Sequence, residues 1–301
     1  MTLANTIQDA RAYLAPQDVD CVVYHSPCND GSGAALSAWL LLGDKAHYQR
    51  LMYHEPFVEE SVRDKNVIVV DASFKKEQFL RLRTIAKKIM ILDHHFSAME
   101  DLAGESGCFF CMDNSGAILS WYYFHGMDAN PPRLLSLIED RDLWRWHDRP
   151  QSEPLYYALR TRCPNSNFKS YIPYVQEKKL QDLIAYGQTL VAENHRWCEQ
   201  AALKARERIF IVPGTSEQYK IMCREVDNDK LVSELSEYLY TKYQVDFILL
   251  WSRTNSGQYK LSFRTMHKDI NLGAIAAALG GGGHKQAAGA VLNVSPEKFL
   301  Q

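Results

Sequence analysis

The 301-residue sequence predicts an α/β fold with two domains, a larger one built on a parallel sheet and a smaller α/β one, joined by a helical linker. In the first half of the chain, short apolar runs alternate with helical segments. Strands of continuous apolar character are typical of a parallel sheet that helices cover on both faces. Strand-like runs return in the last third, after a long helical stretch. The expected bounds are 1–187 for the first domain, 188–208 for the linker and 209–301 for the second domain.

Three short runs predict the strands of the first domain: Cys21–Tyr24, Val67–Val70 and Ile89–Leu92. Helices are expected at 33–42 and 75–88, between these strands. Helical patterns then dominate from 115 to 208, with breaks at the proline-containing stretches 131–132 and 150–167. Proline removes a backbone donor and clashes with the preceding turn, so it commonly interrupts a helix.

The segment 171–208 is long and polar, and we expect it to be a solvated helix that connects the domains rather than a nucleic-acid-binding face. Beyond it the pattern is again that of an α/β domain. The expected strands there are 208–212, 219–223, 247–251 and 259–264. The expected helices are 230–240 and 272–279.

Charge and cysteine content restrict the class of partner. The formal net charge is −2, so the chain has no overall positive field to hold long duplex nucleic acid, which favours a small substrate. The seven cysteines are odd in number and irregularly spaced, which indicates reduced thiols and a cytoplasmic protein. The sequence contains no apolar run of about 18 residues, so we expect no membrane span and no membrane partner. A homodimer is compatible with the sequence.

Imidazoles and carboxylates follow the three predicted strands. His25 follows the first, Asp71 the second, and Asp93, His94 and His95 the third. Because ligands of open parallel sheets bind beyond the carboxyl ends of the strands, we expect these side chains to meet in one crevice. Each residue alone is more often a turn or helix-cap residue. Three successive strand ends that all carry such groups favour a site.

Two further acidic positions belong to this candidate site. Asp30 lies in the loop after the first strand, and the cluster Glu139–Asp142 follows a helical run. Imidazoles and carboxylates without paired cysteines suit Mn²⁺, Mg²⁺, Fe²⁺ or Zn²⁺. Such a set can hold two metals about 3.5–4 Å apart, the usual arrangement for cleaving phosphoesters.

A glycine run near the C-terminus suggests an anion site. Residues 280–283 are glycines, followed by His284. They form either a flexible linker or a nest of backbone N–H groups that binds phosphate, and the second interpretation is favoured. Arg264, at the end of a predicted strand, would add a cation. Three aromatic residues are candidates for base stacking, although core packing is the more common role of such residues: Tyr53, Trp144 and Trp146.

The motifs together resemble those of the DHH phosphoesterase superfamily. Asp93-His94-His95 resembles the motif that names the family, and HSPCNDG from His25 resembles its first motif. Asp71 is similar to its second motif and DRDLW from Asp140 to its fourth. GGGHKQAAG, from Gly281 to Gly289, is similar to the signature of the DHH-associated substrate-binding domain. The motifs span residues 25–289 in the family's order.

The resemblance implies roles for individual residues. Asp71 would bridge two metals, His25 would serve one of them, and Asp30, His94 and Asp142 the other. Asp142 is preferred to Asp140, which would lie behind the ligands or cap the following turn. His95 would face the phosphate and act in catalysis with Asp71 and Asp30. The implied substrate-binding residues are His95, Arg264, Gly281, Gly282, Gly283 and His284.

One position departs from the family pattern. Cys28 stands where the family's first motif usually has an aspartate. Its thiolate could replace the carboxylate as a metal ligand and bias the site toward softer metals. Otherwise Cys28 is not a ligand, and the first metal is bound weakly or through water.

The resemblance implies an oligoribonuclease of the nanoRNase and exopolyphosphatase-related branch. We expect a divalent metal, Mn²⁺ first, and hydrolysis of very short RNA, such as the 5′-phosphorylated dinucleotide pGpG, to mononucleotides by metal-activated water. One alternative is an exopolyphosphatase or a phosphatase of 3′-phosphoadenosine 5′-phosphate (pAp) or another small nucleotide. The other, motivated by Cys28, is a nucleotide-binding sensor that has lost catalysis.

Overall fold

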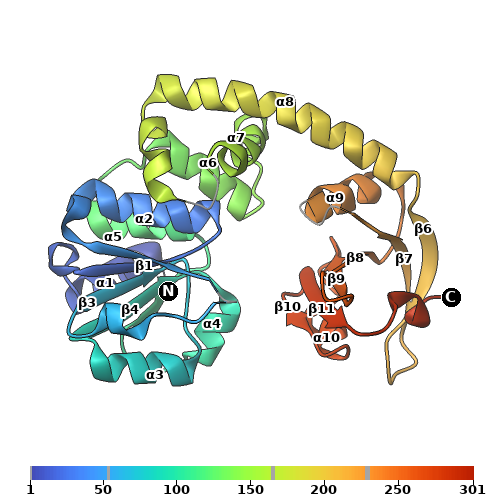
Figure 1. Ribbon diagram of the computed structural model, residues 1–301, viewed down its shortest axis with the longest axis horizontal. Helices are drawn as coiled ribbons and strands as arrows, with labels where there is room; N and C mark the ends of the chain where they lie inside the picture. The colour runs from blue at the N-terminus through green and yellow to red at the C-terminus, as the bar shows by residue number, and fades with distance from the viewer. Residues whose placement is uncertain (1, 53–54, 164–166, 228–230) are drawn as a thin grey trace. The chain divides into compact units, whose positions relative to one another are not determined.

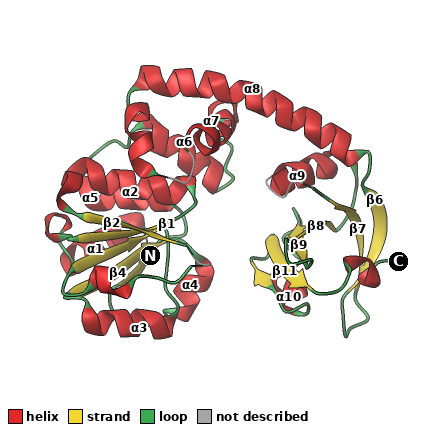
Figure 2. Cartoon of the chain, viewed as in Figure 1, coloured by secondary structure: helices red, strands yellow, loops and turns green. Residues whose placement is uncertain are grey.

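The computed structural model describes residues 2–52, 55–163, 167–227 and 231–301. The chain forms two compact units, residues 1–191 and 192–301, which are considered separately below. Both units combine helices with a sheet, which confirms the α/β class (Figure 2). Among the described residues, no helix is both long and apolar enough to cross a membrane.

The first unit is built on a five-stranded parallel sheet with the order β2-β1-β3-β4-β5. Its strands are β1 (Cys21–His25), β2 (His47–Leu51), β3 (Asn66–Val70), β4 (Lys88–Asp93) and β5 (Cys108–Phe110). The three apolar runs predicted as strands are β1, β3 and β4, which are direct neighbours. Their side chains are buried on both faces of the sheet, which explains their continuous apolar character.

Helices cover both faces of this sheet (Figure 1). The helices α1 (Leu3–Tyr13), α2 (Asn29–Leu42) and α5 (Gly116–His125) share one apolar cluster with alternate residues of β1, β3 and β4. The other face packs against α3 (Lys76–Ile85) and α4 (Phe96–Asp101). A further layer packs on α2 and α5 and contains α6 (Arg133–Asp142), α7 (Arg149–Arg162), a 3₁₀ helix (Phe168–Val175) and the start of α8 (Glu177–Ala202).

A break in the helical pattern is expected at 150–167, but helix α7 occupies Arg149–Arg162. Pro150 lies in the first turn, where backbone N–H groups have no partner within the helix, so the N–H that proline lacks is not missed. Pro154 is accommodated one turn later. The linker also ends earlier than the expected 208, because α8 stops at Ala202 and a strand begins at Arg206. The unit boundary at 191 therefore falls inside α8.

The second unit contains a six-stranded mixed sheet with the order β10-β11-β9-β8-β7-β6. The strands are β6 (Arg206–Ile211), β7 (Gln218–Glu225), β8 (Phe247–Arg253), β9 (Tyr259–Arg264), β10 (Gly282–Gly283) and β11 (Ala287–Leu292). One face packs against α9 (Val232–Lys242) and the end of α8, and the other against α10 (Leu272–Ala277). The expected helix at 230–240 begins at Val232, and residue 230 is outside the described residues.

Candidate metal centre

The side chains predicted to meet do so at the carboxyl edge of the parallel sheet. His25 ends β1, Asp71 follows β3, and His94 follows β4. Asp30 comes from the first turn of α2, and Asp142 from the last turn of α6. The edge therefore gathers groups from five elements whose residues are far apart in the sequence.

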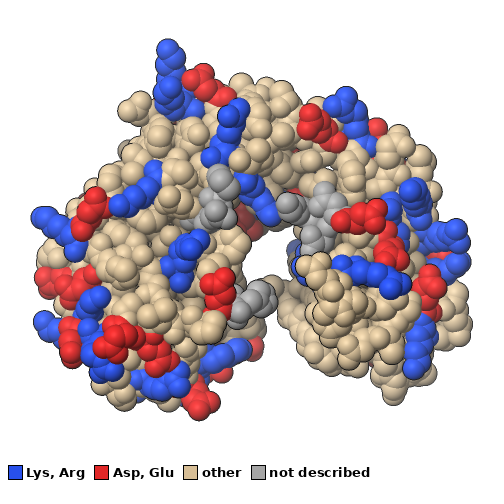
Figure 3. All heavy atoms as spheres, viewed as in Figure 1, with Lys and Arg blue, Asp and Glu red and all other residues tan. Residues whose placement is uncertain are grey.

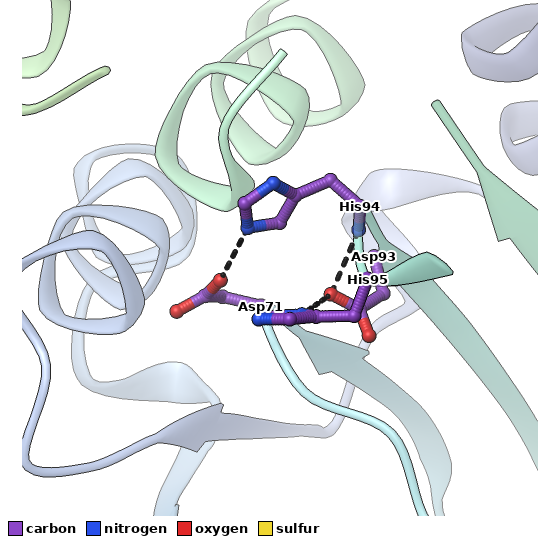
Figure 4. A group of neighbouring side chains, drawn as sticks. All are labelled: Asp71, Asp93, His94 and His95. Carbon is purple, nitrogen blue, oxygen red and sulfur yellow. Dashed lines mark hydrogen bonds and ion pairs between the residues drawn. The ribbon is translucent and has the colours of Figure 1, made fainter. Parts of the chain in front are cut away.

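Asp71 lies at the centre of the group. His94 Nε2 is 3.1 Å from Asp71 Oδ1 and His25 Nδ1 is 3.5 Å from Asp71 Oδ2 (Figure 4 shows Asp71 and His94). Among the described residues, Asp71 Oδ2 is buried without a hydrogen bond. A buried carboxylate oxygen without such a partner is costly, and a cation would satisfy it.

The backbone around Asp71 is unusual in two respects. Asp71 has a φ of +53°, in the left-handed region that aspartate and asparagine enter more easily than most residues. Gly116, at the start of α5, passes so close that a Cβ atom there would lie 2.4 Å from Asp71 Cβ. Glycine at 116 therefore allows α5 to approach the carboxylate, a role that sequence reasoning missed.

A second set of donors lies on the other side of His94. His94 Nε2 is 3.6 Å from Asp30 Oδ2 and 3.7 Å from Asp142 Oδ2. Asp30 is held in place because the backbone N–H groups of Gly116 and Ala117 donate to its two oxygens at 2.6 and 3.0 Å. The ligand atoms of Asp30, His94 and Asp142 all lie within 4.8 Å of one another, which is compatible with a shared cation.

Cys28 belongs to the first set of donors. Its Sγ, an imidazole nitrogen of His25 and a carboxylate oxygen of Asp71 lie within 4.8 Å of one another. Burial, followed by the nearby carboxylate of Asp71, raises the pKa of the Cys28 thiol well above its usual value. Without a cation this thiol is therefore protonated. A bound cation would favour the thiolate, since metal binding displaces protons from thiol ligands.

The carboxylates strongly perturb one another. Burial, and then the charge of Asp71, raise the pKa of Asp142 to about 6, and the same causes raise the pKa of Asp30 well above its usual value. Although burial opposes it, the neighbouring imidazoles of His25 and His94 keep the pKa of Asp71 below its usual value. Burial also acts against His94, yet the hydrogen bond to Asp71 and the charge of Asp30 raise its pKa to about 10. The crowding of buried acids is typical of functional sites and of cation sites.

Asp93 orients the adjacent histidines. Its Oδ1 accepts hydrogen bonds from His95 Nδ1 and from the backbone N–H of His94, both at 2.7 Å (Figure 4). Its Oδ2 accepts a hydrogen bond from the Ser73 hydroxyl at 2.7 Å. Although burial opposes it, the bond to Asp93 raises the pKa of His95. The sequence placed Asp93 in the motif without a role, and it gave no signal for Ser73.

Asp140 and Asp142 point in different directions. Both oxygens of Asp140 accept backbone hydrogen bonds, from His147 at 2.7 Å and from Asp148 at 3.2 Å. Although burial acts the other way, the nearby Ser152 hydroxyl and these backbone hydrogen bonds lower the pKa of Asp140. Asp140 thus caps the loop that follows α6 and is not among the donors around His94, whereas Asp142 is.

Part of the glycine run, which the sequence suggested as a nest of N–H groups, is engaged in backbone hydrogen bonds. The N–H of Gly281 donates to Ala276 O and that of His284 to Ala287 O, each at 2.8 Å. Gly282 and Gly283 pair with β11. A Cβ atom at Gly281 would lie 2.1 Å from Gly289 O, so glycine here serves close backbone packing.

Arg264 lies beside the start of β11, paired with Ala287 across the sheet. Its guanidinium donates to Phe263 O at 2.9 Å and to the Ser233 hydroxyl at 3.4 Å. The binding roles of Arg264 and of residues 281–284 remain predictions.

The aromatic candidates of the first unit differ in environment. Trp144 is 37% exposed, and Trp146 packs against it with ring centroids 4.9 Å apart. The remaining candidate, Tyr53, lies outside the described residues.

The second unit contains a known domain. Residues 217–300 match the DHHA1 domain. Over the whole chain, uncharacterized protein R106 of Acanthamoeba polyphaga mimivirus is 25% identical over 294 residues, which cover 90% of this chain and 67% of that protein.

Three solved structures share the fold. RecJ from Thermus thermophilus, in complex with Mn²⁺, has a TM-score of 0.58 at 14% identity and covers 97% of this chain, which spans 52% of RecJ. The pGpG-specific phosphodiesterase PggH from Vibrio cholerae has a TM-score of 0.56 at 12% identity, and the match covers 90% of this chain and 92% of PggH. An exopolyphosphatase-related protein from Bacteroides fragilis has a TM-score of 0.54 at 13% identity, and the match covers 98% of this chain and 93% of that protein.

The family match thus assigns a DHHA1 domain to residues 217–300, and the solved structures show that the fold is shared over most of the chain. At these identities, the likeness to the solved structures concerns the fold.

Proposed function

We propose that this protein is a metal-dependent phosphodiesterase that hydrolyses very short RNA, such as pGpG, to mononucleotides. The observation that carries the proposal is the position of Asp71 between two donor sets. Asp71 Oδ2 faces His25, and Asp71 Oδ1 faces His94, which adjoins Asp30 and Asp142. A carboxylate whose two oxygens face different donor sets is suited to bridge two cations.

The residues present fit divalent metals. The donors are imidazole nitrogens and carboxylate oxygens, which suit Mn²⁺, Mg²⁺, Fe²⁺ and Zn²⁺, with Mn²⁺ as our first choice. His25, Cys28 and Asp71 would hold one ion, and Asp71, Asp30, His94 and Asp142 the other. The buried Asp71 Oδ2, which has no hydrogen bond among the described residues and lies 3.5 Å from His25 Nδ1, is well placed to accept a cation.

When bound, such metals lower the pKa of a water and neutralise charge on a phosphate. His95 would act on the substrate itself. Because its Nδ1 is bonded to Asp93, its Nε2 is the ring nitrogen that can donate to a phosphate oxygen. The raised pKa of His95 favours the doubly protonated ring, a stronger donor to an anion.

The charge distribution supports a small substrate. The formal net charge is −2, and acidic and basic residues are interspersed on the visible face of each unit (Figure 3). Long nucleic acids are usually held by an extended basic surface. The fold shared with a pGpG-specific phosphodiesterase is compatible with a dinucleotide substrate. An exopolyphosphatase-related protein shares the fold as well, so the substrate has to be measured.

A substrate panel tests the proposal. With Mn²⁺ present, we expect kcat/KM for pGpG to exceed that for pAp, polyphosphate and a long single-stranded RNA by at least about tenfold, or about 1.4 kcal/mol of transition-state binding. A preference for pAp or polyphosphate would instead indicate a small-molecule phosphatase or exopolyphosphatase. Tight nucleotide binding without any turnover would indicate a sensor.

Metal binding is expected to stabilise the first unit. In the metal-free protein, the buried carboxylates of Asp30 and Asp71 lie close to the more exposed Asp142, and a divalent cation relieves their repulsion. At about one hundred times the dissociation constant, a ligand of the folded state adds about 2.7 kcal/mol. For a unit of this size we expect Mn²⁺ to raise the first thermal transition by about 5–10 °C.

Differential scanning calorimetry with and without Mn²⁺ measures this shift. The Asp142→Asn variant should show a smaller shift than the wild type, whereas the Asp140→Asn variant should retain the full shift from a lower starting temperature. A wild-type protein that Mn²⁺ does not stabilise would contradict the metal centre.

A further inference from the structure

The first unit contains a cavity beside the candidate metal centre. The cavity lies between the N-terminus of α2 and the helices α6 and α7, and its volume is about 350 Å³. Cys28, Asp30 and Asp142 line the side that adjoins the metal centre. Cations held by these residues would bind a phosphate at this edge, and a group that extends from that phosphate would enter this α6–α7 cavity.

One wall of the cavity is apolar. It is formed by leucines and an isoleucine from α6 and α7, among them Leu137, Leu155 and Leu159. Phosphate oxygens placed against such a wall would lose their hydration without gaining partners, which is costly. This wall is therefore a poor surface for a phosphate and a suitable one for a base or a sugar.

The other wall carries two guanidinium groups close to a tyrosine ring. The guanidinium of Arg141 lies 4.2 Å from the ring centre of Tyr156, and that of Arg160 lies 5.5 Å from it. Arg160 also donates to the Tyr156 hydroxyl at 2.6 Å. Guanidinium planes stack on nucleobases and donate hydrogen bonds in their own plane. This wall can therefore recognise a planar, polar ring.

The position of Arg141 is fixed by strained neighbours. Its guanidinium also lies 4.0 Å from the ring centre of Trp144 and 5.2 Å from that of Trp146. Both tryptophans have a left-handed backbone, with φ values of +53° and +58°. Such conformations cost about 1–3 kcal/mol each and persist where the surrounding structure imposes them, often at functional sites. Here they keep two indoles on Arg141.

We propose that the α6–α7 cavity binds the nucleoside part of a nucleotide substrate whose phosphate is held by the divalent cations at Asp30 and Asp142. The volume is within the range of about 300–1,000 Å³ that is usual for small-molecule sites. This inference rests on the proposed function and makes it more specific, because it favours a nucleotide over polyphosphate as the substrate class.

Isothermal titration calorimetry in the presence of Mn²⁺ tests the proposal with adenosine 5′-monophosphate, guanosine 5′-monophosphate and inorganic phosphate as probes. We expect the wild type to bind at least one of the nucleotides at least about tenfold more tightly than phosphate. The Leu159→Phe variant fills the cavity and should lower nucleotide affinity about tenfold, while the affinity for phosphate changes by less than about twofold.

The Arg160→Ala variant provides a second measurement that does not alter the core, because Arg160 is exposed. It should weaken nucleotide binding about threefold or more and leave phosphate binding unchanged. The matched control is Arg162→Ala, because Arg162 lies on the same helix and over another tyrosine, Tyr186, and does not line the cavity. This control should bind all three probes as the wild type does.

The results separate the cavity from the catalytic proposal. A wild type that hydrolyses pGpG but binds phosphate and both nucleotides equally would refute the nucleoside site and leave the phosphodiesterase intact. Unchanged nucleotide affinity in the Leu159 and Arg160 variants, or equal losses for phosphate and nucleotide, would also refute it. A wild type that binds none of the probes and hydrolyses none of the substrates would refute both proposals.

Discussion

Replacing Asp71 with asparagine is expected to lower turnover of the preferred substrate by at least about a thousandfold. Changes to residues that only support metal ligands typically cost about 10–100-fold in affinity or activity, and Asp71 is proposed to contact both ions directly. Asparagine accepts the left-handed φ of +53° nearly as well as aspartate, so the fold should be retained. Steady-state kinetics measures the loss of turnover, and equilibrium dialysis with Mn²⁺ measures the accompanying loss of metal binding.

The matched control is Asp44→Asn, a change of the same chemistry at an exposed aspartate that pairs with Lys169 on the surface. It should keep wild-type turnover and metal content. Circular dichroism should show that both variants are folded. If the Asp71→Asn variant turned over substrate at the wild-type rate, neither the bridging role nor the metal centre built on it would stand.

The Gly187→Ala variant is expected to destabilise the first unit by about 3 kcal/mol, the reverse of the usual effect of this change. Inside a helix, alanine is normally more favourable than glycine by about 0.5–1 kcal/mol. At position 187 of α8, however, a Cβ atom would lie 2.0 Å from Pro154 O on α7, and that atom belongs to the backbone. The two helices would have to move apart, and overpacking of this kind costs about 1–3 kcal/mol or more.

Urea unfolding followed by circular dichroism measures this loss as a lower midpoint. The control is Gln188→Ala, at the next and exposed position of α8, which should change stability by less than about 0.5 kcal/mol. A stabilised Gly187→Ala protein would show that α7 and α8 do not pack at Pro154 as described.

The central strands and the positions of the site residues could be predicted from the sequence for one physical reason. Strands β1, β3 and β4 are buried on both faces, so each shows four successive residues of buried character. They are also neighbours in a parallel sheet, so the residues that follow them meet at one edge. The same argument cannot choose between acids on a helix, and Asp142 is preferred to Asp140 through the family resemblance.

Other elements gave no such signal. Strand β2 (His47–Leu51) is an edge strand in which only Leu51 is buried, so its sequence is largely polar. Helix α7 contains Pro150 and Pro154, and local rules favoured a loop there. The glycines at 281–283 suggested anion binding, because the sequence does not show that β11 and α10 pass close to them. In each case contacts between distant segments decide the structure.

All of the proposed metal donors lie between His25 and Asp142, within the first unit, and the glycine-rich signature lies wholly in the second. Substitutions that reshape residues 192–301 therefore leave the coordinating groups untouched. Mutations at the proposed metal donors and at residues 281–284 can thus be made independently, and their effects on metal content and on phosphate affinity can be measured separately.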